Sequence, residues 1–261
     1  LDNLDIQALA INPNTPSTVY AGTGGDGVYR TDSSGGTWNL RSAGLPGAGL
    51  GTVDVGVEAL TIDPVQLSTV YAGLDPGGVY KTTDGASNWS FSNVGLIASK
   101  TEALVIDPSS TNTIYAGTDS QAVYRSTDGG QNFSARNQGI QNDNVQALVI
   151  DFADTSILYA GTRERGVFQS INGGFAWNQT TAGALANDAN VQVLAIQPNG
   201  SVPIYAGTNG GGVFKSLTNS PPSWSDSNDA NLTNTANVQA LVIDPNFTDT
   251  LCAGTNGEGV F

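Results

Sequence analysis

Carboxylates are the side chains of this sequence best able to do chemistry. The chain has 23 Asp and Glu residues, no His and a single Cys, Cys252, so imidazole sites, paired-thiolate sites and an intrachain disulfide are excluded. Two aspartates, Asp75 and Asp119, each stand four residues after a tyrosine, at Tyr71 and Tyr115. Paired carboxylates about 5–10 Å apart are what glycoside hydrolysis requires. Asp75 and Asp119 therefore stand at equivalent positions in the sequence.

Both tyrosines belong to a segment of about 45 residues that is repeated along the chain. Its central Tyr-Ala-Gly-Thr motif occurs with small variations six times, and its anchor residues are Tyr20, Tyr71, Tyr115, Tyr159, Tyr205 and, with a thiol in place of the ring, Cys252. Repetition of this length indicates a supersecondary unit that is stabilised by stacking on copies of itself.

Each unit contains four short apolar segments, which we name strands a to d. Strand a is Ile6–Ile11 in the first unit, strand b carries the tyrosine, strand c is 27–30, and strand d carries a Trp or Phe. The last Ile of strand a and the strand-b anchor are nine residues apart in all six units, and the strand-c aromatic follows the anchor by nine. Constant spacings of this kind predict four-stranded antiparallel sheets joined by hairpins, repeated as the blades of an all-β propeller.

The repeats fill the chain without a linker, so we expect one β-propeller domain over residues 1–261. Its units lie near 5–41, 57–92, 101–136, 145–180, 191–226 and 238–261. The last unit stops at Phe261, its strand-c aromatic, and therefore lacks the outer strand. An uncovered strand edge is a liability. We expect the missing strand to come from an upstream segment, a seventh unit or a neighbouring molecule.

The turns between strands c and d carry a second signature, in residues 82–89, 126–133 and 170–177. They resemble the Asp-box, or bacterial-neuraminidase-type (BNR), repeats of sialidases, sortilin-like receptors, xyloglucan-degrading glycoside hydrolases and photosystem II assembly-factor propellers. The resemblance covers the whole chain and implies a propeller fold, but it selects no activity. Within the turns we expect Asp84, Asp128 and Asn172 to close the backbone by accepting N–H groups.

The resemblance to xyloglucan-degrading hydrolases implies a catalytic role for Asp75 and Asp119, because those enzymes place a catalytic Asp in a b–c turn, four residues after the strand-b aromatic. They set two carboxylates across a cleft between two propellers, however, and this chain has one. Sialidases need three converging Arg side chains, whereas here only Arg163 and Arg165 stand in a b–c turn. We therefore expect the chain not to be an enzyme, with solvated turn carboxylates at both positions.

The net charge of the chain limits the classes of partner that it is expected to bind. The formal net charge is −14, which disfavours nucleic acid and anionic lipid, and no apolar run reaches the length of a membrane span. One polar residue recurs near each strand-a start, in the order Gln7, Glu58, Glu102, Gln146, Gln192 and Gln239. Since four of the six are neutral amides, we expect a hydrogen-bonded ring, with no metal and no cofactor.

Function is expected on the face formed by the b–c turns and the d–a connections, because connection length varies only there and loops on a rigid scaffold carry binding sites. The predicted binding residues are Asp26, Asp75, Asp119, Arg163, Glu164, Arg165, Asn209, Asn256, Leu45 and Leu50. We expect Leu45 and Leu50 to be exposed, and Cys252 to be buried as a small hydrophobe.

Low Lys content with much Asn, Thr, Ser and Gly fits an extracellular or periplasmic protein. We therefore expect a non-catalytic scaffold or binding propeller that takes a protein partner or self-assembles. The alternative is a carbohydrate-active propeller, either a glycan binder or a glycoside hydrolase.

Overall fold

A computed structural model describes residues 5–47, 55–97, 100–180, 182–186, 189–198, 202–218, 222–228, 232–247 and 250–261. The chain divides into two compact units: unit 1 is Leu1–Asp119 with Tyr124–Ala135, and unit 2 is Ser120–Val123 with Arg136–Phe261. Each unit is treated separately below. That the whole chain is a single propeller domain stays a prediction.

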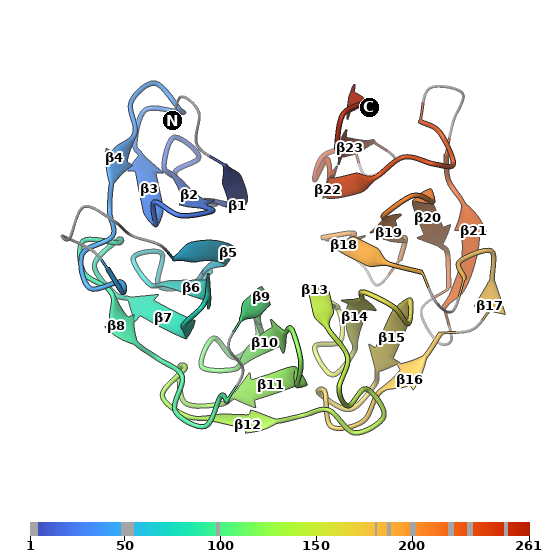
Figure 1. Ribbon diagram of the computed structural model, residues 1–261, viewed down its shortest axis with the longest axis horizontal. Helices are drawn as coiled ribbons and strands as arrows, with labels where there is room; N and C mark the ends of the chain where they lie inside the picture. Colours follow the sequence, from blue (N-terminus) through green and yellow to red (C-terminus); the bar gives the residue numbers. More distant parts are fainter. Residues whose placement is uncertain are drawn as a thin grey trace. The chain divides into compact units, whose positions relative to one another are not determined.

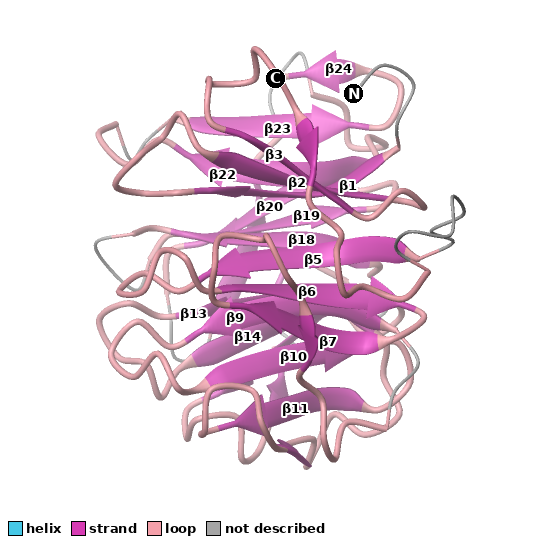
Figure 2. Ribbon diagram, turned by 90° about the vertical axis from the view of Figure 1, so that its left-hand side faces the viewer, coloured by secondary structure: helices cyan, strands magenta, loops and turns pink. Residues whose placement is uncertain are grey.

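Unit 1 contains three antiparallel sheets of four strands each, and the described residues include no helix (Figures 1 and 2). The first sheet has β1 (Ile6–Ile11), β2 (Val19–Thr23), β3 (Val28–Thr31) and β4 (Asn39–Leu40). The second has β5 (Gly56–Ile62), β6 (Val70–Asp75), β7 (Gly78–Thr82) and β8 (Ser90–Phe91). The third has β9 (Thr101–Ile106), β10 (Ile114–Thr118), β11 (Ala122–Ser126) and β12 (Phe133–Ala135), and β11 runs across the unit boundary.

Unit 2 continues the same pattern. The fourth sheet has β13 (Val145–Ile150), β14 (Leu158–Thr162), β15 (Val167–Ser170) and β16 (Asn178–Gln179). The fifth has β18 (Val191–Ile196), β19 (Ile204–Thr208), β20 (Gly212–Ser216) and β21 (Ser223–Asp226), and β17 (Ala182–Gly183) joins it parallel to β21. The sixth has only β22 (Val238–Ile243), β23 (Leu251–Thr255) and β24 (Gly259–Val260).

These sheets confirm the predicted all-β fold of six propeller-type repeat units, with a last unit of three strands. The predicted strand a of the first unit has the same bounds as β1. The added strand β17 was not predicted, because the two-residue segment Ala182–Gly183 has no alternating apolar pattern. No described segment forms a helix long and apolar enough to cross a membrane.

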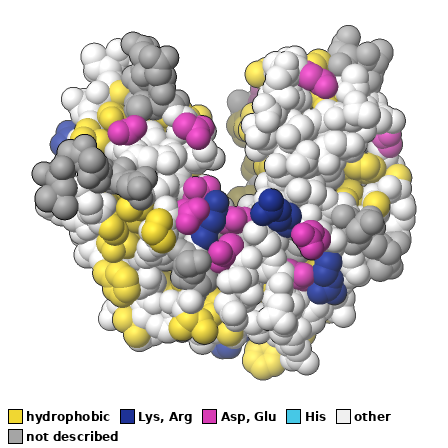
Figure 3. Space-filling model, viewed as in Figure 1, with side chains coloured by type: hydrophobic (Ala, Val, Ile, Leu, Met, Phe, Trp, Pro, Cys, Tyr) yellow, Lys and Arg dark blue, Asp and Glu magenta, His cyan; other side chains and the backbone are white. Residues whose placement is uncertain are grey.

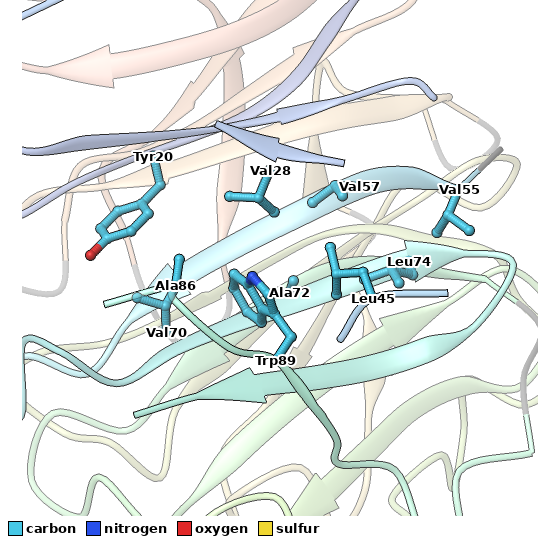
Figure 4. Packing of buried hydrophobic residues seen from close by; sticks show 10 residues of the cluster. All are labelled: Tyr20, Val28, Leu45, Val55, Val57, Val70, Ala72, Leu74, Ala86 and Trp89. Carbon is cyan, nitrogen blue, oxygen red and sulfur yellow. The ribbon is translucent and has the colours of Figure 1, made fainter. Parts of the chain in front are cut away.

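Within each unit, strand-b tyrosines are buried between successive sheets, as predicted, and these are Tyr20, Tyr71, Tyr159 and Tyr205. Tyr20 and Val28 of the first sheet pack in one cluster with Val57, Ala72 and Trp89 of the second (Figure 4). In the next pair of sheets, the Tyr71 hydroxyl donates to the Gly129 carbonyl oxygen at 3.0 Å. The Lys81 ammonium lies 5.2 Å from the Tyr71 ring centroid and donates to the same carbonyl. Within unit 1, each of these sheets therefore covers the apolar core of the sheet before it.

The c–d turns are closed by the aspartates that the sequence predicts for this role. Asp84 accepts the Asn88 backbone N–H at 2.9 Å and the Asn88 amide at 2.9 Å, and Asp128 accepts the same two groups from Asn132. In the fourth sheet Asn172 accepts the Ala176 N–H at 2.9 Å. An uncharged amide thus suffices for the backbone bond.

Lowering the pH should destabilise the c–d turns of unit 1. Hydrogen bonds from Asn88 and Asn132 lower the pKa values of Asp84 and Asp128 to about 2, against about 3.9 for an unfolded Asp. The stabilisation is therefore present above about pH 4 and is lost as pH falls towards 2. Urea titrations at pH 5 and pH 2 measure this loss. Between these two pH values, the free energy of unfolding should fall less in the double variant Asp84→Asn/Asp128→Asn than in wild type. An equal loss in both proteins would contradict this assignment.

Two predicted exposures were wrong. Leu45 is buried in the cluster that contains Trp89, because the connection turns at Gly44, at a φ of 91°, and places Leu45 under the next sheet. Cys252 is exposed. The equivalent tyrosines owe their burial to the following sheet, and no described sheet of unit 2 follows the sixth. Leu50 lies outside the described residues.

Candidate binding edge

The b–c turns of both units are held by backbone hydrogen bonds at the end of the sheet where strand a begins. We call this end the b–c edge. Gly24 N–H donates to the Asp5 carbonyl at 2.8 Å and Asp119 N–H to that of Lys100 at 3.4 Å in unit 1. In unit 2 the corresponding donors are Arg163, Asn209 and Asn256, and their acceptors are the carbonyls of Asn144, Asn190 and Asn237. The turns therefore present their side chains from a fixed backbone.

A lysine surrounded by carboxylates dominates the b–c edge of unit 1. The Lys100 ammonium lies 3.3 Å from Glu58 Oε2, 3.3 Å from Asp75 Oδ2 and 3.6 Å from Glu102 Oε1. Burial by itself would lower the pKa of Lys100, but the charges of Glu58 and Glu102 outweigh it and the pKa is raised. Lys100 therefore keeps its charge around neutral pH, with three carboxylates within 3.6 Å of its ammonium group.

The two candidate catalytic aspartates have different surroundings. The Asp75 side chain is 42% exposed and shares Lys100 with two other carboxylates. The Asp119 residue is half-buried, in the turn between β10 and β11. The ammonium group of Lys100 forms an ion pair with Asp75 Oδ2 at 3.3 Å. The geometry at Asp75 is that of an ion-paired turn residue.

The remaining predicted residue of unit 1 is exposed. Asp26 projects from the β2–β3 turn, where its N–H donates to Thr23 Oγ1 at 2.9 Å and its backbone bridges to Val55. The acidic residues at this edge, counted over the described part of unit 1, are Asp5, Asp26, Glu58, Asp75, Glu102 and Asp119, and the basic residue is Lys100. This edge is therefore strongly acidic.

The b–c edge of unit 2 is mixed in charge. Arg163, Glu164 and Arg165 are exposed in the β14–β15 turn. The Arg165 guanidinium donates to Asp143 Oδ2 at 2.9 Å and lies 4.8 Å from the Phe168 ring centroid. Burial raises the pKa of Asp143, against the opposing effect of Arg165. Asn209 and Asn256 are exposed at the two following turns.

Figure 3 shows the two groups of charged side chains, one over β5 and β9 and the other over β14 and β15. No group of three or more His, Cys, Asp or Glu side chains in the described part of the chain is arranged to hold a metal ion. The three carboxylates that come together in unit 1 belong to Glu58, Asp75 and Glu102, and they surround the ammonium group of Lys100.

Sequence reasoning missed Lys100 and Asp143. Lys100 stands two residues before Glu102 and at the start of strand a, so its proximity to Glu58 of the preceding unit could have been inferred from the repeat register. Asp143 has no counterpart at the same distance before strand a in the other units, and nothing in its sequence neighbourhood indicates its pairing with Arg165.

Comparisons with known proteins agree on the fold. No family model matches the chain. A segment of 88 residues is 33% identical to a probable oligoxyloglucan-reducing end-specific xyloglucanase of Neosartorya fischeri, and this match covers 32% of the chain and 10% of that protein. The match is too partial to show a family.

Solved structures resemble the chain over nearly all of its length. A GH74 enzyme of Niastella koreensis is similar at a TM-score of 0.76 and 17% identity, over 96% of this chain and 40% of that one. YCF48 bound to D1 peptide matches at 0.66 and 18%, over 98% and 77%. The extracellular domain of a putative one component system, BT4673, from B. thetaiotaomicron matches at 0.71 and 19%, over 98% and 32%. At these identities the likeness shows the fold alone, which is that of a β-propeller.

Proposed function

We propose that this chain is a non-catalytic binding propeller of the Asp-box type that works outside the cytoplasm and binds a protein partner at its b–c edge. The observation that carries the proposal is the acidic edge of unit 1, where backbone-anchored turns and strand starts hold Glu58, Asp75 and Glu102 around Lys100. A pre-organised, charged surface favours a partner of opposite charge. The partner segment is therefore expected to be rich in Lys or Arg.

Two comparisons support this reading. YCF48, which has the same fold, is seen with a peptide bound, so a propeller of this kind can act through peptide recognition. The BT4673 match is an extracellular domain, which agrees with the expectation of an extracellular or periplasmic location. The exposed polar residues of unit 2, among them Arg163, Glu164 and Arg165, would add a second contact region of mixed charge.

A displayed library of random peptides, selected on the immobilised protein, tests the proposal even though the natural partner is unidentified. We expect the selected peptides to be enriched in Lys and Arg. Glu58→Gln/Glu102→Gln should weaken their binding by about tenfold or more, because opposite charges are removed at the contact. Both replacements have precedents in Gln146 and Gln192, which occupy the equivalent positions in unit 2.

The matched control is Asp84→Asn/Asp128→Asn, which removes the same charge from the c–d turns. Asn172 already makes the backbone bond at the equivalent position, so the control should fold normally and keep its affinity. Selected peptides without basic residues, or equal weakening by the two double variants, would contradict a binding site at the acidic edge.

A carbohydrate-active protein is the second candidate, and the partial match to a xyloglucanase favours it. The Lys100–Asp75 pair leads us to expect no hydrolysis. Incubation with xyloglucan and other β-glucans should release no new reducing ends, and Asp75→Asn and Asp119→Asn should leave this result unchanged. Sugar release that either variant abolishes would establish the enzyme instead. Glycan binding without hydrolysis, measured by calorimetry, would support the binding form of this alternative.

A further inference from the structure

The fold does not require a lysine side chain at position 100. The equivalent positions of the other units, two residues before the polar residue near each strand-a start, are Asp5, Gly56, Asn144, Asn190 and Asn237. In the third sheet the Lys100 carbonyl accepts the N–H of Asp119 from the b–c turn, and in unit 2 the carbonyls of three asparagines make the same bond. The repeat therefore uses the backbone at this position, and an asparagine serves as well as a lysine.

The acidic neighbours of Lys100 depart from the repeat as well. Glu58 and Glu102 stand near the starts of β5 and β9, where the other four units carry Gln7, Gln146, Gln192 and Gln239. Asp75, the last residue of β6, completes the group. These departures lie together at the b–c edge of unit 1, among the charged side chains over β5 and β9 (Figure 3). A local break in an otherwise regular pattern is typical of a functional site.

The ammonium group of Lys100 lies among its three acidic neighbours at long distances. It is 3.3 Å from Glu58 Oε2 and from Asp75 Oδ2, and 3.6 Å from Glu102 Oε1, whereas a charge-assisted N–H···O bond is about 2.7–2.9 Å long. A lysine side chain is a flexible stem with a compact charge at its end. Lys100 can therefore leave this position when a competing cation arrives.

A basic side chain of a partner would be attracted to the same carboxyl groups. It could not approach them closely while the Lys100 ammonium group stays among them, since two like charges a few ångströms apart repel each other. If the incoming group were also an ammonium, the exchange would only replace one point charge by another. A guanidinium group gains more, because its five N–H donors lie in a fixed plane and can bond two carboxylates at once.

We propose that Lys100 is an internal competitor, whose ammonium group occupies in the free protein the place that the guanidinium group of a partner arginine takes on binding. This role rests on the proposed function, since it concerns the same acidic edge, and it defines the chemical group by which the partner is recognised. Lys100 thereby lowers the affinity for every basic partner, and it favours arginine over lysine at the contacting position of the partner.

Two synthetic peptides test this role by calorimetry, one of alternating glycine and arginine and the other of alternating glycine and lysine. Wild type should bind the arginine peptide more tightly than the lysine peptide. Lys100→Asn should bind the arginine peptide about fivefold more tightly than wild type does, because the competing ion pairs are gone. The control Lys81→Gln removes the same charge from strand c of the second sheet, where the fourth sheet has Gln169, and should keep the wild-type affinity.

The displacement of Lys100 can also be followed in the wild-type protein. The chain has three lysines, Lys81, Lys100 and Lys215, so the NMR signal of Lys100 in protein labelled at lysine Cε is assigned by its absence from Lys100→Asn. A saturating amount of the arginine peptide should make the Lys100 side chain more mobile and leave the other two lysines unchanged.

Equal or weaker binding of the arginine peptide by Lys100→Asn would overturn the proposal and show that Lys100 instead holds the carboxyl groups in place. An unchanged Lys100 signal at saturation, or equal wild-type affinities for the two peptides, would overturn it as well. The variant Glu58→Gln/Glu102→Gln separates this failure from that of the proposed function. If it loses affinity for the arginine peptide, the acidic edge remains the binding site and only the role of Lys100 is rejected. If it keeps its affinity, or if wild type binds neither peptide, both are rejected.

Discussion

Replacing Gly44 with alanine is expected to destabilise the protein by about 2–5 kcal/mol, from the cost of a positive φ and from steric overlap in a packed interior. Gly44 has a φ of 91°, and a Cβ there would collide with the backbone carbonyl of Trp89. Trp89 N–H donates to the Ala43 carbonyl at 2.7 Å and its indole donates to that of Arg41 at 2.7 Å. The obstructing backbone is therefore held in place.

Gly35→Ala is the matched control for this variant. Gly35 has the same φ of 91°, but a Cβ there would meet nothing within 4 Å. Urea unfolding should give a loss of about 1 kcal/mol for the backbone conformation alone, and the difference between the variants measures the close contact between the first two sheets. Equal losses at the two positions would show that the contact at Trp89 contributes nothing to stability.

Truncating Tyr71 to alanine should cost about 3–5 kcal/mol, because it removes a fully buried ring and leaves a cavity between the second and third sheets. Tyr71→Phe should cost about 1 kcal/mol or less. It removes only the hydroxyl bond to Gly129, whose carbonyl still accepts from Lys81 at 3.0 Å. Thermal or urea unfolding measures both variants. A loss below about 1 kcal/mol for the alanine variant would be too small for a buried aromatic.

The repeat made most of the fold predictable. The same nine-residue spacings recur in all six units, so an ambiguous apolar segment in one unit could be assigned from its equivalents in the others. The roles of Asp84 and Asp128 were predictable for a different reason, since an Asp before glycines in a hairpin has few alternatives to capping the turn.

Predictions made from equivalent positions in other units were wrong where the burial of a side chain depends on a neighbouring sheet. Cys252 was assigned by analogy with the tyrosines, but a side chain at this strand-b position is buried only when another sheet packs on it. Leu45 was read as exposed because its connection is rich in glycine, and Gly44 in fact turns the chain back into the core. The sequence could not show which acidic side chains pair with Lys100 and Arg165, because a long side chain at a strand start has several acceptors within reach.

Photo-crosslinking in the source cells tests most directly whether the b–c edge is the binding surface. A photoreactive amino acid would replace Asp26 in the β2–β3 turn of unit 1 in one protein and Gln131 in a c–d turn of the same unit in another, since both positions are exposed. We predict a discrete protein adduct from position 26 and none from position 131. Adducts from position 131 alone, or equal adducts from both positions, would contradict a binding surface at the b–c edge.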